Sequence, residues 1–235
     1  MWASWWLKRG VDHRATQHEL TEAPGLLARV PLVGRVVTGD ALYCQRHLCQ
    51  QIMAAGGDYL FTVKGNQPAL HAAIALLFAE PPPGELFATA VTVNRHGDRR
   101  EERQLWTSTL LNEYVEWPGV RQVCKRESVV ERKGKVTRAV WYAVTSLDLT
   151  AADVLMRWRG HWGIETRLHW VRDETLGEDR STVRTGNAPR VWAGLRNAVI
   201  GVVRGAGWTN MAAALRHYAW QPDDALALLG ITPSQ

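Results

Sequence analysis

Two kinds of hydrophobic pattern alternate in the first 84 residues of this chain. Short runs of almost continuous apolar residues are typical of buried strands in parallel sheets. Apolar positions at helical spacing instead predict helices with one buried side. Helical spacing occurs in residues 18–29, 41–55 and 70–78, and apolar runs occur at 33–38 and 58–63. The resulting order of strand, helix, strand and helix predicts that the two strands are parallel.

A different pattern, alternating apolar and polar residues, occupies much of the chain from residue 85 to residue 146. Alternation of this kind predicts strands that have one buried and one exposed face. Tight turns at 96–98 and 133–135 separate the strands. We therefore expect a mostly antiparallel, β-rich insertion that lies apart from the main sheet.

Helical patterns return after residue 147. In residues 156–179, the apolar residues Ile164, Leu168 and Val171 recur at helical spacing. A loop, a long apolar helix and two short helices follow, and the sequence shows no internal repeat and no clear boundary between two domains. The expected organisation is an α/β fold with a core part at 1–84, the insertion at 85–146 and a C-terminal helical part at 147–235.

The composition is that of a globular protein, with 46% hydrophobic and 22% charged residues among 235. The net charge of +5 is compatible with a polyanionic partner but does not demand one. The three cysteines lack C-x-x-C spacing, which argues against a disulfide framework or a zinc site and fits a reducing cytoplasm. No apolar run approaches the roughly 18 residues that span a bilayer, so we expect no membrane partner.

Cations are frequent in the expected insertion. One interpretation is a sheet face that is charged because it is solvated. The other is a surface that contacts the phosphates of a nucleic acid. The residues concerned are Arg95, Arg99, Arg100, Arg103, Arg121, Lys125, Arg126, Arg132, Lys133, Lys135 and Arg138.

One carboxylate lies among cations and aromatic residues in the stretch 156–179. At about 100° per residue, His161, Glu165 and Arg172 fall on one adjoining face of a helix, close to His169. This arrangement suits a functional carboxylate. It equally suits a buried amphipathic helix in which Glu165 forms an ion pair with Arg172, and the pattern alone favours that simpler interpretation.

A second candidate, Asp40, lies just past the apolar run 33–38. In open α/β sheets, ligand and metal sites lie at the carboxyl ends of the strands. An aspartate in this position is also a common helix N-cap. The segment Lys64-Gly65-Asn66-Gln67 follows the other apolar run directly, and by itself it would pass as a turn in which Asn66 caps the next helix.

Three sequence blocks resemble one protein family. The block R-G-H-W-G-I-E-x-x-L-H-W-x-x-D, from Arg159 to Asp173, resembles the C-terminal catalytic block of DDE transposases of bacterial insertion sequences, ISAs-one type. The glutamate of that block is the last member of the family's Asp-Asp-Glu triad, and Glu165 matches it. V-V-T-G-D-A-L-Y-C-Q resembles the block of the second aspartate, which Asp40 matches. G-G-D-Y-L-F-T-V-K-G-N-Q-P is similar almost letter for letter.

The resemblance implies an incomplete ribonuclease-H-like catalytic core that carries the β-rich insertion and ends in a helical region. It implies cleavage and transfer of DNA strands with two divalent cations, Mg²⁺ (or Mn²⁺), held by Asp40 and Glu165. We expect these carboxylates to lie within about 4–8 Å of each other, with Arg159 or His161 beside the same cleft. The side chains expected to bind DNA or to support the site are Lys64, Asn66, Gln67, Arg159, His161 and His169. The implied partners are DNA, as insertion-sequence ends and target, and a second copy of the chain in a homo-oligomer.

The family's first triad aspartate belongs to a D-G-K motif on an opening strand, and this sequence contains no D-G-K. Asp12 is the only aspartate before Asp40 and is a poor substitute, because His13-Arg14 follows it. We therefore expect the C-terminal part of a transposase, truncated before that aspartate and inactive alone.

Three functions stay open. The first is a transposase that cuts and joins DNA, and the second is a catalytically dead, DNA-binding remnant that interferes with an intact transposase. The third is a metabolic α/β enzyme, and the absence of any G-x-G-x-x-G or P-loop motif in the sequence counts against it.

Overall fold

The computed structural model describes residues 13–164 and 170–231 of the chain. These residues form two compact units, one ending at His161 and the other beginning at Trp162. Each unit is described by itself. In the part of the chain that the structure describes, no helix is long and apolar enough to cross a membrane.

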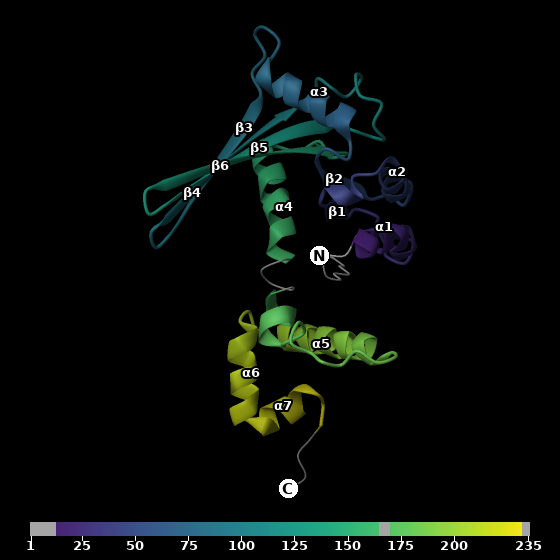
Figure 1. The fold of residues 1–235 in the computed structure, drawn as a ribbon, viewed down its shortest axis with the longest axis vertical. Coiled ribbons are helices and arrows are strands. Elements are labelled where there is room, and N and C mark those ends of the chain that lie inside the picture. Colours follow the sequence, from purple (N-terminus) through teal and green to yellow (C-terminus); the bar gives the residue numbers. More distant parts are fainter. Residues whose placement is uncertain (1–12, 165–169, 232–235) are drawn as a thin grey trace. The chain divides into compact units, whose positions relative to one another are not determined.

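The first unit is built on one six-stranded sheet in the order β1-β2-β6-β5-β4-β3 (Figure 1). The strands are β1 Val36–Gly39, β2 Asp58–Val63, β3 Ala88–His96, β4 Arg99–Ser108, β5 Gln122–Arg132 and β6 Lys135–Thr145. The pair β1 and β2 is parallel, as the sequence predicted, and every other neighbouring pair is antiparallel. This mixed α/β architecture agrees with the expected ribonuclease-H-like fold class.

The position of the insertion differs from the expectation. Its four strands form as predicted, but they continue the main sheet, because β6 pairs with β2 from Leu60↔Thr145 to Val63↔Tyr142. The reason lies in the last residues of β6, where Ala143 and Val144 are both buried although they point to opposite faces. A segment that is apolar on both faces is stable only inside a sheet. The prediction that these strands lie apart from the main sheet was therefore wrong.

The helices of the first unit are α1 His13–Leu27, the 3-10 turn η1 Ala41–Tyr43, α2 Arg46–Ala54, α3 Pro68–Ala79 and α4 Ala151–Ile164. The second unit contains the π-helical turn η3 Val171–Thr175 and the helices α5 Ala188–Gly205, α6 Met211–Trp220 and α7 Pro222–Leu228. Its core is formed by Val171, Ile200, Val203, Met211 and Ala214.

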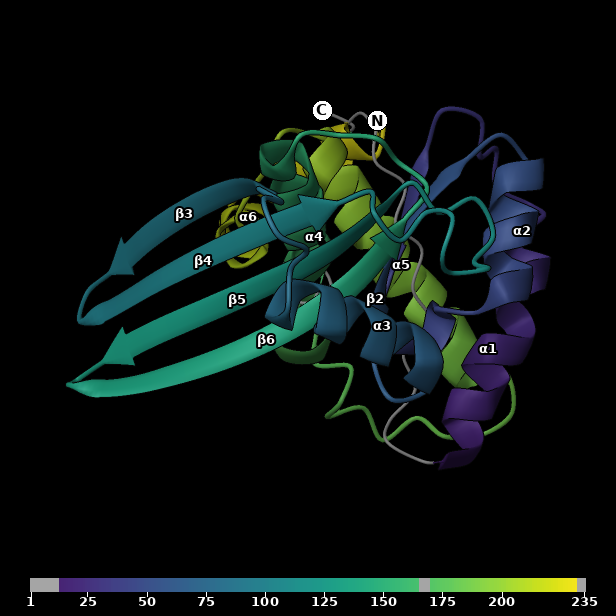
Figure 2. The same ribbon diagram turned by 90° about the horizontal axis from the view of Figure 1, so that it is seen from above.

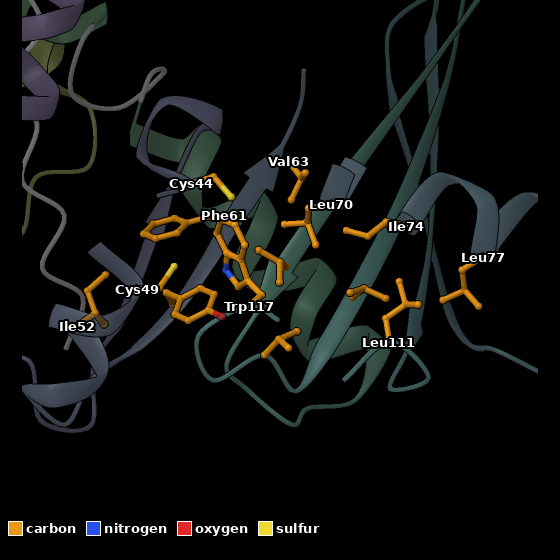
Figure 3. Packing of buried hydrophobic residues seen from close by; sticks show 14 of the residues in the cluster. Cys44, Cys49, Ile52, Phe61, Val63, Leu70, Ile74, Leu77, Leu111 and Trp117 are labelled. Carbon is orange, nitrogen blue, oxygen red and sulfur yellow. The ribbon is translucent and has the colours of Figure 1, made fainter. Parts of the chain in front are cut away.

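Side-chain alternation gives the sheet two separate cores. Phe61 and Val63 on β2 point to the face that α2 and α3 cover, where Ile52, Leu70 and Ile74 meet them (Figure 3). We call this the α3 face. On the opposite face, the intervening Leu60 packs against residues of α4. Figures 1 and 2 show α3 and α4 on opposite sides of the sheet. We call the face of Leu60 the α4 face, and its core consists of Leu60, Leu105, Cys124, Ala143, Ala151, Val154, Leu155 and Trp158.

Two-residue loops fix the register of the outer strands. The loop between β5 and β6 consists of Lys133 and Gly134, whose φ angles are +50° and +74°. Positive φ at both central residues is the requirement of a type I′ turn, whose twist matches that of the flanking strands. Gly97 and Asp98 connect β3 and β4 in a loop of the same length.

Candidate functional site

Asp40 lies directly after β1, at the carboxyl end of the strand, and its side chain is exposed. Its Oδ1 accepts a hydrogen bond of 2.9 Å from the backbone N–H of Leu42. Asp40 therefore caps the short turn η1, and the expected helix over 41–55 is divided into η1 and α2, which begins at Arg46 after the extended residue Gln45. The cap uses one lone pair of one oxygen, and an ionised carboxylate has about four such sites, so capping and metal binding are compatible.

Gly39 fixes the path of the backbone immediately before Asp40. A Cβ atom at this position would lie 2.9 Å from the Phe61 ring and 3.0 Å from the Cβ of Tyr43. Real side chains do not approach so closely, and the glycine therefore lets the end of β1 pack against the core. The sequence signal was the G-D pair, but its reason is visible only in the contact with Phe61.

The loop after β2 is tied to the loop after β1. Asn66 donates from Nδ2 to the backbone oxygen of Ala41 over 2.5 Å, and Gln67 donates from Nε2 to that of Cys44 over 2.9 Å. These amides hold the backbone that follows Asp40. Asn66 does not cap α3, because the N-cap position belongs to Gln67. Lys64, in the same loop, is exposed.

The last turn of α4 approaches β1. The Nδ1 atom of His161 lies 3.2 Å from the hydroxyl oxygen of Thr38, two residues before Asp40. Glu165 would follow the last residue of α4, Ile164, but both Glu165 and His169 lie outside the described residues. The expected separation of 4–8 Å between the carboxylates of Asp40 and Glu165 thus stays a prediction.

Arg159 contacts a different part of the sheet from His161. When the Asn94 amide is oriented with its oxygen toward the two guanidinium groups, it accepts from Nη1 of Arg103 at 2.7 Å and from Nη2 of Arg159 at 3.3 Å. Asn94 belongs to β3, at the edge of the sheet opposite β1. Because residues two apart on a helix are about 200° apart, Arg159 and His161 leave α4 on opposite sides. Of these two, it is His161 that contacts the strand of Asp40.

Arg172 has a partner other than the one considered from the sequence. Its Nε and Nη2 atoms each lie 2.6 Å from a carboxylate oxygen of Glu178. The guanidinium group is largely buried, and the backbone oxygen of Arg172 also accepts from the N–H of Glu178. Two of the five guanidinium N–H donors therefore serve Glu178. The alternative ion pair of Arg172 with Glu165 stays a prediction, because Glu165 lies outside the described residues.

The chemistry of the available ligands favours a hard cation. Among the described residues, no group of three or more His, Cys, Asp or Glu side chains is placed to hold a metal ion. The three cysteines are buried and free, and burial raises the pKa of the Cys49 and Cys124 thiols to about 12. Such thiols stay protonated at neutral pH and do not ligate metal ions. The exposed carboxylate of Asp40 offers the oxygen ligand that Mg²⁺ or Mn²⁺ prefers, and the donor chemistry therefore fits these ions.

Comparisons with known proteins agree with these features. The family model described as "Transposase DDE domain" matches residues 9–201. The chain is 34% identical over 197 residues to "Putative protein YbfL" of Escherichia coli (strain K12), covering 79% of this chain and 52% of that protein. The same identity and coverage apply to "H repeat-associated putative transposase YhhI" of that strain. "Putative transposase YncI" of Escherichia coli O157:H7 is 31% identical over 207 residues, covering 83% of this chain and 52% of that protein. The chain spans about half the length of these relatives.

Proposed function

Because this chain belongs to the transposase DDE domain family, we propose that Asp40 and Glu165 are two carboxylates of a site that cleaves and transfers DNA strands. The proposal includes the ends and the target of an insertion sequence as the DNA partners. A homo-oligomer is part of the proposal, since transfer joins two DNA ends to one target.

The contact between His161 and Thr38 is the observation that carries this proposal. It brings the last described turn of α4 beside β1, the strand that directly precedes Asp40, and Glu165 follows Ile164 in the sequence. Asp40 and Glu165 are far apart in sequence, so only the fold can bring them together. A helix that passes beside the carboxyl end of a strand is a workable way to do so.

Each candidate residue has a defined part in the proposed site. Asp40 and Glu165 would hold Mg²⁺ or Mn²⁺. When bound, such ions would activate a nucleophile and stabilise the leaving oxygen. Asn66 and Gln67 hold the loop around Asp40 in place through backbone carbonyl oxygens. His161 orients the end of α4. The cations among the candidates, Lys64 and Arg159, would contact DNA phosphates together with His169.

We further propose that the 235-residue polypeptide binds DNA without cleaving it. The two-metal mechanism of the family uses three carboxylates, and the D-G-K motif of the first is not in this sequence. A protein with this property could interfere with an intact transposase by occupying DNA. Incubation with duplex DNA in Mg²⁺ or Mn²⁺ tests this step, and cleavage that Glu165→Gln abolishes would contradict it.

A thermal melt of Glu165→Gln, with and without Mn²⁺, tests the role of Glu165. In the metal-free protein, a ligand carboxylate close to Asp40 is repelled by it, so the substitution leaves the melting temperature unchanged or raises it. Mn²⁺ should raise the melting temperature of the wild type, because a ligand that binds only the folded state stabilises it by about 2.7 kcal/mol at a hundred times its Kd. The substitution should remove this rise.

Glu178→Gln is the matched control for that experiment. It removes the charge of the carboxylate that accepts two hydrogen bonds from Arg172. The substitution should therefore lower the melting temperature and leave the response to Mn²⁺ intact. Loss of one partner of a buried pair costs about 3–5 kcal/mol, and the partial exposure of Glu178 makes that an upper bound. If Glu165→Gln behaves like this control, Glu165 is structural and the proposal is wrong.

A further inference from the structure

Strand register assigns every charged side chain of β3–β6 to one of two faces. The ladders are continuous from Arg99↔Arg132 to Ser108↔Val123 and from Gln122↔Thr145 to Arg132↔Lys135. Since side chains alternate strictly along a regular strand, each residue lies on the same face as its cross-strand partner. Leu105 marks the α4 face and Trp106 the α3 face.

The two faces differ in charge. On these four strands, the α4 face carries five cations and one carboxylate, whereas the α3 face carries four cations and three carboxylates. We call the charged part of the α4 face the cationic face, and it consists of Arg99, Arg103, Arg126, Arg132 and Lys135 with Glu101. The α3 face carries Arg95, Arg100, Lys125 and Arg138 with Glu102, Glu127 and Glu131.

Three cations of the cationic face occupy neighbouring positions on adjacent strands near the hairpin turns. Arg99 pairs with Arg132 in the ladder, and Arg132 pairs with Lys135. Like charges directly opposite each other on a sheet are destabilising. Few carboxylates compensate these charges: Arg99 lies 3.0 Å from Glu101, and Arg132 lies 4.0 Å from Asp98. This row therefore does not favour folding, but it offers adjacent cations to a polyanion.

A buried arginine continues the cationic face toward α4. Arg126 is 5% exposed, and its guanidinium carbon lies 4.4 Å from the centre of the Trp141 ring and 4.7 Å from that of Trp158. Its buried Nε atom has no hydrogen-bond partner among the described residues. Burial, followed by the nearby charge of Arg103, lowers the pKa of Arg126 to about 10, so the cation persists at neutral pH. Its charge is held in place by aromatic rings and is not neutralised by a bonded carboxylate.

Arg103 lies close enough to Arg126 to influence its charge, and Arg159 does the same to Arg103. Arg103 forms an ion pair with Glu101 at 2.5 Å, and it shares the Asn94 oxygen with Arg159 of α4. From the level of Arg99 to that of Leu105, the ladder partner of Arg126, the strand rises roughly 20 Å at about 3.3 Å per residue. One strand of duplex DNA carries a phosphate about every 3.4 Å along its axis, so the cationic face matches the length of about six phosphates.

We propose that the cationic face, together with Arg159, binds the phosphate backbone of duplex DNA. The proposal rests on the proposed function, which makes DNA the substrate, and adds which face of the sheet receives it. Guanidinium groups suit this partner because they bond phosphate oxygens in pairs. The outer halves of β3–β6 extend beyond α3 and α4 in Figure 2, and residues 94–100 and 131–138 at this end of the strands are exposed.

Two triple variants with the same change in net charge separate the faces. The test variant is Arg99→Gln, Arg132→Gln and Lys135→Gln on the cationic face. The control variant is Arg95→Gln, Arg100→Gln and Arg138→Gln on the α3 face of the same strands. Binding of a fluorescent 20-base-pair duplex is measured by anisotropy against salt concentration in EDTA, with melting temperature as the check on folding.

The cationic-face variant should lower the slope of log K against log salt by about 2–3 and weaken binding roughly tenfold or more at 0.1 M salt. The control should lower the slope by less than about 1. The melting temperature of the test variant should stay level or rise, because the row of like charges is relieved. Equal effects of the two variants, or no binding by the wild type, would overturn the inference. The stabilisation by Mn²⁺, which reports on Asp40 and Glu165, is independent of this result. Equal effects of the two variants would therefore overturn the assignment of the face and leave the proposed metal site untouched.

Discussion

The two faces of one sheet are used in different ways. On the α3 face, Phe61, Ile74 and their neighbours form an apolar core, and the charges beyond it nearly balance. On the α4 face, the core includes Trp158 stacked on a buried arginine, and the charges beyond it are almost all positive. The α3 face thus serves mainly to stabilise the fold. The α4 face combines a packed core with an excess of positive charge at the surface. The comparison shows that burial alone does not identify which side of a sheet is only structural.

The largest expected effect comes from the α3 face. Phe61→Ala removes a ring that is 1% exposed and that stacks on Tyr59 with centroids 5.4 Å apart. Loss of a fully buried aromatic ring costs about 3–5 kcal/mol in the free energy of unfolding, because a cavity remains. Urea denaturation measures it. A cost below about 1 kcal/mol would mean that this core is loosely packed and would break the comparison.

A smaller effect is expected from the buried arginine of the α4 face. Arg126→Met keeps the volume between Trp141 and Trp158 and removes a charge that burial makes costly. The lost cation–π contacts are worth about 0.5–2 kcal/mol each, and removal of a desolvated charge offsets part of that. The net change in the free energy of unfolding should therefore stay within about 2 kcal/mol. A loss as large as that of Phe61→Ala would show that Arg126 is chiefly structural.

The effect that is smallest at neutral pH concerns one buried thiol on each face, Cys49 on the α3 face and Cys124 on the α4 face. Burial raises the pKa of both to about 12, whereas an unfolded chain has thiols near their usual value. The folded state therefore keeps protons that the unfolded state loses, so stability is complete below about pH 8.5 and declines as the pH rises toward 12.

Each thiol should contribute a decline of about 1.4 kcal/mol per pH unit in that window. Cys49→Ala and Cys124→Ala should each flatten the dependence of the unfolding free energy on pH by one proton. Denaturation at a series of alkaline pH values measures this. If only Cys49→Ala makes the unfolding free energy less dependent on pH, water reaches Cys124 on the α4 face. The two faces would then differ in water access as well as in charge.

Hydrophobic periodicity predicted most of the elements. The apolar run at 58–63 is β2 residue for residue, and the alternation after residue 85 gave all four outer strands. The parallel pairing of β1 and β2 followed from their order along the chain. Patterns of this kind succeed because the buried side of an element is encoded in the element itself.

Contacts between distant elements were beyond the reach of such patterns. The family resemblance placed Arg159 or His161 beside the expected cleft, but no pattern indicated the contact of His161 with Thr38 or the ion pair of Arg172 with Glu178. The cationic face was also hidden, because the nine cations on the strands β3–β6 separate into sets of five and four only when strand register is known. The role of Asp40 and Glu165 in metal binding rests on the family resemblance and stays a prediction.

The two-residue hairpin loops have a consequence for how this protein can change length. Because faces alternate with period two, one residue inserted or deleted within an outer strand would exchange its cations with its apolar side chains. The tight turn at Lys133 and Gly134 has no slack to absorb such a shift. The longer connection between β4 and β5, residues 109–121, does. Over evolutionary time, insertions and deletions in this part of the chain should therefore occur mainly in 109–121. Within the outer strands they should involve an even number of residues, because only an even shift keeps each side chain on its face.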